Sequence, residues 1–188
     1  MLRIISGKHK NRVIPTLRTA KYRPSTGKLK ESIFSILTSG EFIDNQLFSS
    51  NINVLDLFSG TGSLGFEALS RGSGFVTLVD INPDYLNLAK QFASLIKEKE
   101  NMSFLCLDAG NLPSSNQKYD VVFIDPPYHK NLATKALTSL VRANWLKNNA
   151  VIAVEVAKTD DINLSDNIRF INSRIYGHTK LLILKYNE

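Results

Sequence analysis

The sequence of 188 residues has only one cysteine, Cys106, and three histidines. A single cysteine cannot form an internal disulfide, and it cannot supply the cysteine clusters typical of structural metal sites. None of the histidines has another histidine or a cysteine close to it in the sequence. We therefore expect neither a disulfide scaffold nor a metal ion, and we expect Cys106 to be a small buried residue.

Long apolar runs are also missing. No run approaches the roughly 20 apolar residues that a membrane helix needs, and the first residues turn basic too soon for a secretory signal. Hydrophobic residues make up 43% and charged residues 21% of the chain, as in ordinary globular proteins. The length suits one domain with a full core. We expect a cytoplasmic monomer with no membrane contact.

Acidic residues are absent from the first 30 positions, which hold nine of the 23 Lys and Arg residues. The rest of the chain has 14 basic and 17 acidic residues, so the whole positive excess lies in this segment. Runs 2–5 and 12–14 predict a β-hairpin with a basic turn. We expect residues 1–22 to form a basic arm on a single larger domain of residues 23–188, with the arm binding nucleic acid. The alternative is a terminus whose charge serves only solubility. The side chains expected to contact nucleic acid are Arg3, Lys8, His9, Lys10, Arg12, Arg18, Lys21 and Arg23.

The remaining chain alternates short β-branched runs with helical stretches. Strands are predicted at 53–58, 75–79, 102–107, 119–124 and 150–156. Helices are predicted at 64–71, 83–97 and 132–143, preceded by one that Ser25 or Thr26 caps and that ends near Gly40. This alternation predicts a doubly wound α/β fold with a mostly parallel sheet. Runs 168–175 and 181–186 predict an antiparallel hairpin at one edge, which brings the sheet to seven strands.

A glycine-rich loop follows the first predicted strand. Residues 56–65 read DLFSGTGSLG and contain G-x-G-x-x-G ahead of a helix. The pattern also suits a dinucleotide, or a tight turn without a ligand. Asp56 favours a different ligand, because a carboxylate there would repel a diphosphate and could face an ammonium group. S-adenosylmethionine carries such a group, so we expect it as the cofactor.

Acidic residues end the next two strands. Asp80 is placed to accept hydrogen bonds from ribose hydroxyls, and Asp108 to accept one from an adenine amino group. Asp108 could instead cap a helix at the surface. The residues expected to bind the cofactor are Thr26, Asp56, Phe58, Ser59, Gly60, Thr61, Gly62, Asp80, Ile81, Asp108, Ala109 and Asp125.

The fourth strand ends in Asp125-Pro126-Pro127-Tyr128. An aromatic amine is a poor nucleophile until its lone pair is directed at the methyl group. The Asp125 carboxylate and the Pro126 carbonyl could do this by accepting its hydrogens, and Tyr128 could stack on an extruded base. We expect Asp125, Pro126 and Tyr128 to be catalytic; a rigid proline turn would leave the Asp unexplained. Roles for His129 and Glu155 stay open.

These motifs, together with RIISG at 3–7, RPST at 23–26 and ESIF at 31–34, make the chain similar to the RsmD family of guanine-N2 methyltransferases. The resemblance implies a Rossmann-like class I methyltransferase fold and S-adenosylmethionine as the methyl donor. It also implies a guanine of 16S rRNA in the assembling small subunit as target, held by the basic hairpin. The family usually has Asp where Gly27 stands and often Glu where Asp80 stands.

Three other functions compete with this interpretation. An adenine-N6 methyltransferase acting on DNA or RNA would use the same tetrapeptide, since any planar exocyclic amine fits it. An NAD-dependent oxidoreductase would share the glycine loop, but Asp56 and Asp125 disfavour it. A noncatalytic RNA-binding protein would have no need of a cofactor site.

Overall fold

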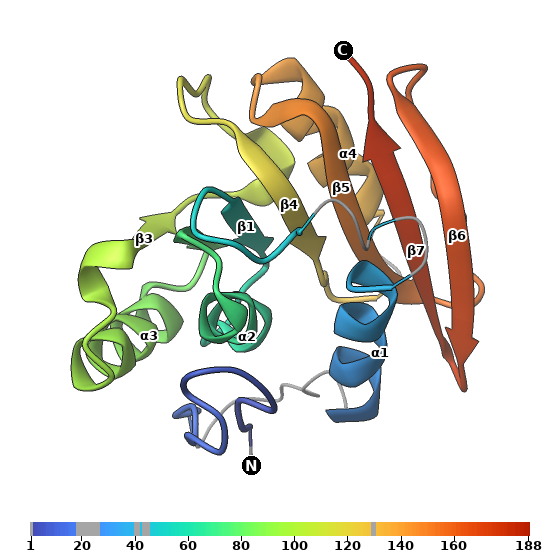
Figure 1. Ribbon diagram of the computed structural model, residues 1–188. Coiled ribbons are helices and arrows are strands. Elements are labelled where there is room, and N and C mark those ends of the chain that lie inside the picture. Colours follow the sequence, from blue (N-terminus) through green and yellow to red (C-terminus); the bar gives the residue numbers. More distant parts are fainter. Residues whose placement is uncertain (1, 18–26, 40–41, 43–45, 129–130) are drawn as a thin grey trace.

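Parallel strands with apolar residues on both faces form the centre of the molecule. The computed structural model describes residues 2–17, 27–39, 42, 46–128 and 131–188 (Figure 1). Its seven-stranded sheet has the order β3-β2-β1-β4-β5-β7-β6, in which β1 to β5 are parallel and β7 is antiparallel to both neighbours. The strands are β1 Asn53–Leu57, β2 Phe75–Asp80, β3 Met102–Cys106, β4 Tyr119–Ile124, β5 Leu146–Ala157, β6 Ile168–Tyr176 and β7 Thr179–Tyr186. The predicted doubly wound sheet with a terminal antiparallel hairpin is confirmed.

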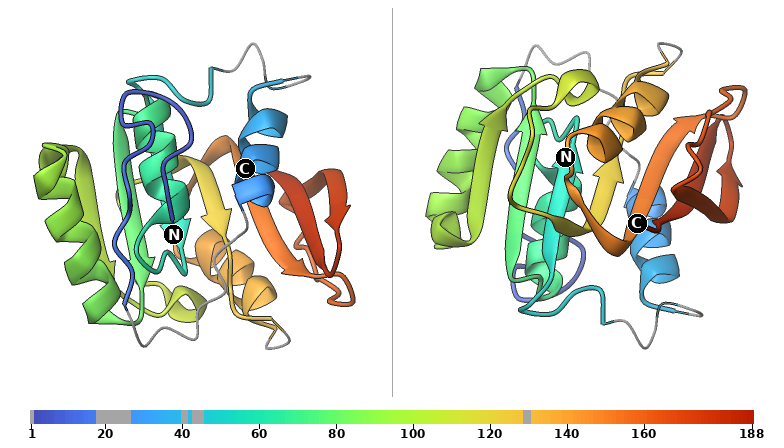
Figure 2. Two further views of the ribbon diagram at one scale, coloured as in Figure 1. Left: turned by 90° about the horizontal axis from the view of Figure 1, so that it is seen from below. Right: turned by 90° about the horizontal axis from the view of Figure 1, so that it is seen from above.

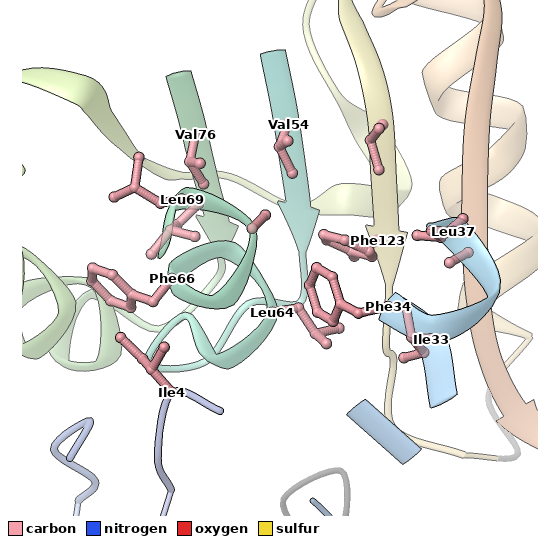
Figure 3. Packing of buried hydrophobic residues seen from close by; sticks show 14 of the residues in the cluster. Ile4, Ile33, Phe34, Leu37, Val54, Leu64, Phe66, Leu69, Val76 and Phe123 are labelled. Carbon is pink, nitrogen blue, oxygen red and sulfur yellow. The ribbon is translucent and has the colours of Figure 1, made fainter. Parts of the chain in front are cut away.

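Helices cover both faces of the sheet (Figure 2). The helices α1 Gly27–Leu37, α2 Ser63–Arg71 and α3 Pro83–Leu95 share one buried apolar cluster with the sheet. Opposite them, α4 Leu132–Arg142 packs on a second cluster, next to the 3-10 turn η3 Ala109–Asn111; a further 3-10 turn, η2 Lys99–Asn101, precedes β3. In the first cluster, Phe34 of α1 lies against Phe123 of β4, with ring centroids 5.5 Å apart (Figure 3).

Two element boundaries differ from the sequence prediction, and the local backbone structure explains each difference. Helix α3 begins as expected, with Pro83 in its first turn and Asn82 accepting the Asp84 amide, but it ends at Leu95 because Lys97 adopts a left-handed φ of 61°. Strand β5 starts at Leu146, four residues early, because Leu146 pairs with Tyr119 ahead of a β-bulge. The sequence did not predict these additional strand residues, because residues 147–149 are polar. The predicted cap of α1, Ser25 or Thr26, lies outside the described residues.

Cys106 was expected to be buried, and this expectation is wrong. It is exposed at the end of β3, where its Sγ lies 3.5 Å from the Ile81 carbonyl oxygen. Strand β3 is an edge strand with one neighbour, so its last residue lacks cover on one side. Among the described helices, none has the length and apolar character needed to cross a membrane.

The N-terminal segment is fastened to α2. Residues 2–14 form a loop closed by one antiparallel bridge, between Arg3 and Val13, so the expected hairpin has no regular strands. Ile4 points towards Phe66 and is 1% exposed (Figure 3). The Lys8 amide donates to the Ser70 carbonyl at 2.8 Å, an approach so close that a Cβ on Gly7 would lie 1.8 Å from the same oxygen. The division at residue 22 stays a prediction.

A buried carboxylate anchors this segment. Glu67 of α2 is 0% exposed; it accepts the Ile5 amide at 2.7 Å and Arg71 Nε at 2.9 Å. Lys30 of α1 is also buried, with its Nζ 3.5 Å from Glu67 and 2.6 Å from the Arg3 carbonyl oxygen. Desolvation by burial lowers the pKa of Lys30, against the attraction of Glu67. One charge pair thus joins α1, α2 and the N-terminal segment.

We expect Glu67→Ala to lower the free energy of unfolding by about 3 to 5 kcal/mol, because it leaves a buried lysine without its counter-charge. Urea denaturation measures this change. Glu31→Ala, which removes an exposed glutamate of α1, is the control and should shift stability by about 0.5 kcal/mol or less. A loss below about 1 kcal/mol for Glu67→Ala would contradict the proposed anchor.

Candidate active site

The polar residues picked out along the sequence come together because parallel strands end at the same edge. Leu57 of β1 lies between Val79 of β2 and Ile124 of β4 in the sheet register. The residues that follow these strands therefore share one edge, where open α/β sheets bind ligands. The glycine loop, Asp80 and the Asp125-Pro126-Pro127-Tyr128 turn meet there.

The glycine loop turns sharply between β1 and α2. Phe58, Gly60 and Gly62 all have left-handed φ angles, of 58°, 53° and 84°. Gly65 packs closely on β2, since a Cβ there would lie 2.4 Å from the Leu78 side chain, which would have to shift. These features bring the loop backbone close to the end of β2. Ser59 and Thr61 are buried within the loop.

Asp80 joins the loop to β2. Its Oδ2 accepts the Gly60 amide at 2.7 Å, and its Oδ1 accepts the Asn82 amide at 2.8 Å. Each carboxylate oxygen can accept a second hydrogen bond, so Asp80 keeps acceptor capacity for a ligand hydroxyl. The next residue, Ile81, is 73% exposed and offers an apolar surface beside that carboxylate. The predicted ligand roles of both residues fit these positions.

Asp56 lies beneath the loop instead of lining its surface. It is 2% exposed, and its Oδ2 accepts the Gly65 amide at 2.8 Å. Burial raises the pKa of Asp56 to about 8; the Gly65 hydrogen bond opposes the rise, and the charges of Asp125 and Asp80 add to it. The carboxyl thus holds the first turn of α2, and its contact with a ligand ammonium stays a prediction.

Asp108 caps the 3-10 turn after β3. The sequence allowed such a cap as the alternative to an adenine contact. Its Oδ1 accepts the Gly110 amide at 2.8 Å, and the neighbouring Ala109 is 4% exposed. A contact between Asp108 and an adenine amino group is compatible with this cap and remains a prediction. Thr26, the first residue of the expected cofactor set, lies outside the described residues.

Two hydrogen bonds hold the side chain of Tyr128, the last residue of the tetrapeptide. Its hydroxyl donates to Glu155 Oε1 at 2.8 Å and lies 2.7 Å from Thr179 Oγ1. Burial raises the pKa of Tyr128 to about 12, with the Glu155 and Asp125 charges adding to the rise. The hydroxyl therefore stays neutral. Asp125 is half-buried and Pro126 is buried; His129 falls outside the described residues.

Glu155 and Thr179 are functional candidates that sequence reasoning did not assign. Glu155, on β5, is 5% exposed, and Thr179 begins β7 opposite Ala157. The only sequence signal was an acidic residue inside the apolar run 150–157. Its partner could not be identified, because the two contacts with Tyr128 span 27 and 51 residues.

An open cavity of about 370 Å³ adjoins the tetrapeptide. Its lining combines the tetrapeptide with the start of α4, the end of β5 and the segment 159–162, and includes Pro126, Tyr128, Leu132, Val156, Asp160 and Ile162. This mixture of apolar and acidic groups next to the Tyr128 ring suits a planar ligand with hydrogen-bond donors. The cavity therefore leaves room beside Pro126 and Tyr128 for such a ligand.

Some of the expected RNA-binding cations have partners within the protein. Lys8 Nζ and His9 Nε2 lie 2.8 Å and 2.7 Å from Glu98 Oε1. Arg3, Lys10 and Arg12 are exposed, and Arg3 donates to the Asn11 carbonyl at 3.2 Å. The other three expected contacts, Arg18, Lys21 and Arg23, lie outside the described residues. Nucleic-acid binding by this segment stays a prediction.

Known proteins share this sequence pattern and fold. The profile of a family described as conserved hypothetical protein 95 matches residues 2–185. An uncharacterized methylase of Rickettsia prowazekii is 44% identical, covering 100% of this chain and 99% of its own length. The ribosomal RNA small subunit methyltransferase D of Haemophilus influenzae is 34% identical over 94% of this chain and 89% of its own.

Solved structures agree with the fold. A candidate methylase from Haemophilus influenzae, 32% identical, matches with a TM-score of 0.80 over 100% of this chain and 99% of its own. An RNA methyltransferase from Salinibacter ruber, in complex with S-adenosyl-L-homocysteine, has a TM-score of 0.66 over 88% and 95% of the two chains. At 13% identity the second match supports the fold alone. The fold is that of the class I methyltransferases.

The raised pKa of Asp56 predicts a specific pH dependence of stability. Between its ordinary value of 3.8 and about 8, the folded chain keeps a proton that the unfolded chain releases. This carboxyl therefore makes the free energy of unfolding fall as pH rises from about 4 to about 8. We expect Asp56→Asn to weaken that fall, as measured by urea denaturation at pH 5 and pH 8. Asp166→Asn, at an exposed loop position, serves as control; an unchanged pH dependence in Asp56→Asn would show that Asp56 is ionised at both pH values.

Proposed function

This chain belongs to the RsmD family, described as conserved hypothetical protein 95, and on that premise we propose that it transfers a methyl group from S-adenosylmethionine to the N2 amine of a guanine in 16S rRNA. Several family relatives, among them those of Haemophilus influenzae and Escherichia coli, are ribosomal RNA methyltransferases by name. We propose the assembling small ribosomal subunit as the form in which the RNA is modified.

The main support is the meeting of three acidic residues from three neighbouring strands. Asp56, Asp80 and Asp125 are close enough that the charges of the last two act on the first. The charges of Asp80 and Asp125 suit a cationic ligand and disfavour the diphosphate of a dinucleotide, and the carboxyl of Asp56 lies buried beside them. This arrangement therefore favours S-adenosylmethionine over NAD.

The residues at this edge fit the parts of the cofactor one by one. Asp80 keeps acceptor capacity for the ribose hydroxyls, the exposed Ile81 can pack against the adenine ring, and the loop around Gly60 allows close backbone approach. When bound, S-adenosylmethionine supplies an electrophilic methyl group on a sulfonium. We propose that the expected contacts of Phe58, Asp108 and Ala109 complete its site.

The tetrapeptide is proposed to activate the amine. The Asp125 carboxylate and the Pro126 carbonyl accept its two hydrogens, so that the nitrogen lone pair is held in one direction. The Tyr128 ring stacks on the extruded base. Glu155 and Thr179 hold the tyrosine hydroxyl and thereby the plane of the ring. They are positioning residues, because they act through Tyr128.

Transfer of a labelled methyl group tests the proposal directly. Purified small ribosomal subunits lacking the modification, free 16S rRNA and duplex DNA are each incubated with the protein and labelled S-adenosylmethionine. We expect label in 16S rRNA. Label in duplex DNA alone would favour an adenine-N6 enzyme, and cofactor binding without transfer to any of the three would contradict the function.

Asp80 and Asp125 should separate cofactor binding from turnover. Asp80→Ala removes a charged acceptor and is expected to weaken S-adenosylmethionine binding by about 1 to 3 kcal/mol. Asp125→Ala should leave that affinity nearly intact while kcat falls by about 100-fold or more, within the range typical for acid–base groups. Calorimetry and the methylation assay measure the two quantities. Unchanged affinity in Asp80→Ala, or wild-type turnover in Asp125→Ala, would refute the respective role.

Tyr128 should contribute chiefly through its ring. Tyr128→Ala removes a stacking surface worth about 1 to 3 kcal/mol and frees the loop, so we expect a loss of about 100-fold in kcat/KM. Tyr128→Phe keeps the ring but loses both hydroxyl contacts, and a loss of about five- to ten-fold is expected. Thr179→Val, which removes one of these contacts, should resemble Tyr128→Phe. Equal losses for Phe and Ala at position 128 would assign the role to the hydroxyl instead.

A further inference from the structure

The edge strand β6 exposes a row of large side chains that the proposed active site does not use. Phe170 is 51% exposed, Ile175 is 56% and Tyr176 is 37% exposed, and Arg169 and Arg174 beside them are also exposed. The register with β7 places Arg169, Arg174 and Tyr176 on one face of the sheet, and Phe170 and Ile175 on the other. We name these five residues the β6 surface. The strand has β7 on one side only, because it ends the sheet (Figure 1). Apolar and aromatic groups of this size seldom face water together without a partner.

The hairpin of β6 and β7 is strongly basic. Residues 168–187 contain four Lys or Arg residues and no acidic residue, although the chain beyond position 30 has an acidic excess. Arg169 lies directly opposite Lys185 in the strand register. Like charges at such a position repel each other, and a bound anion would relieve the repulsion. Within the part of the chain that the structure describes, neither Arg169 nor Arg174 has an ion pair to neutralise it.

The β6 surface leads to the candidate active site. Strand β6 ends at Tyr176, whose hydroxyl is hydrogen-bonded to Ser32 of α1. Three residues later, Thr179 Oγ1 lies 2.7 Å from the Tyr128 hydroxyl. From Arg169 to Tyr176 the strand extends about 23 Å, at about 3.3 Å per residue. A polymer lying along β6 could therefore reach the base beside Tyr128.

We propose that the β6 surface binds an unpaired RNA segment next to the target nucleotide. Unpaired RNA is recognised by stacking on aromatic rings and by arginine contacts, and β6 offers both along the edge of the sheet. In this arrangement the RNA lies along the free edge of the sheet. Arg169 and Arg174 bind phosphates and Tyr176 stacks on a base on one face, while Phe170 stacks on a base at the other face of the same edge. The assignment rests on the proposed function, because it takes the target base to be in the Tyr128 cavity. A protein strand added to the same edge is the competing partner, and two unneutralised arginines favour the polyanion.

Two variants of the β6 surface and two matched controls test this assignment in the full chain. The double variant Arg169→Gln/Arg174→Gln removes two charges, and Phe170→Ala removes one exposed ring. The controls are Lys90→Gln/Lys99→Gln and Leu95→Ala, which make equivalent changes at exposed positions on α3 and η2. Their side of the sheet ends in β3, the edge farthest from β6. Binding of a labelled 12-nucleotide polyuridine is followed by fluorescence anisotropy between 50 and 200 mM salt, a range of about four-fold over which phosphate contacts weaken strongly.

We expect the arginine double variant to bind polyuridine about ten-fold more weakly at low salt. The slope of log affinity against log salt should fall by about 1.4, at about 0.7 for each phosphate contact in a single strand. Phe170→Ala should weaken binding by about five-fold or more with the slope unchanged, since stacking releases no counterions. Both controls should bind within about two-fold of the wild type, the change expected when no contact is lost.

The same variants are then assayed for S-adenosylmethionine binding and for methylation of free 16S rRNA and of small subunits. Cofactor affinity should stay at the wild-type value, while methylation of both RNA substrates should fall together with polyuridine binding. Polyuridine affinity equal to that of the controls would overturn the proposal. So would a loss confined to assembled subunits, which would assign β6 to a protein partner. If the wild type itself transfers no methyl group, the proposed function fails, whereas wild-type activity with unaffected variants refutes only the β6 assignment.

Discussion

The hydrogen bond from the Gly60 amide to the Asp80 carboxylate is the contact on which the candidate active site depends. It fixes the glycine loop against the end of the neighbouring strand at 2.7 Å, and it does so with the carboxylate that faces the proposed ribose position. Asp56, buried below, holds the other end of the loop through Gly65. These two acidic groups thus set the loop conformation, and because Asp80 is also the proposed ribose contact, a change at Asp80 is expected to affect both shape and binding.

Buried carboxylates also explain how positive charge is distributed over the molecule. Glu67 pairs with Lys30, and Glu98 pairs with Lys8 and His9. Part of the basic N-terminal segment is therefore held by ion pairs within the protein. Arg169 and Arg174 on β6 are exposed on the side of the sheet that leads to Tyr128. A count of charges along the sequence therefore cannot separate basic residues that pair within the protein, such as Lys8 and His9, from exposed ones such as Arg169 and Arg174.

The sequence was sufficient for the order of elements and for the edge of the sheet where the candidate active site lies. Apolar β-branched runs, the glycine pattern and Pro83 identify strands and turns locally, and parallel strands necessarily bring Asp80 and Asp125 to one edge. What it could not reveal depends on long-range packing. The Tyr128 contacts with Glu155 and Thr179, the burial of Lys30 and the exposure of Cys106 all follow from which strand or helix lies alongside. A single sequence holds no local signal for such neighbours.

The identity of the methylated nucleoside tests the central claim most directly. Small-subunit rRNA from a strain lacking the gene is treated with the purified protein and S-adenosylmethionine, digested to nucleosides and analysed by mass spectrometry. The account predicts one added methyl group, recovered as N2-methylguanosine and absent when the Asp125→Ala variant is used. Recovery of N6-methyladenosine, or of the same N2-methylguanosine with the Asp125→Ala variant at full yield, would contradict it.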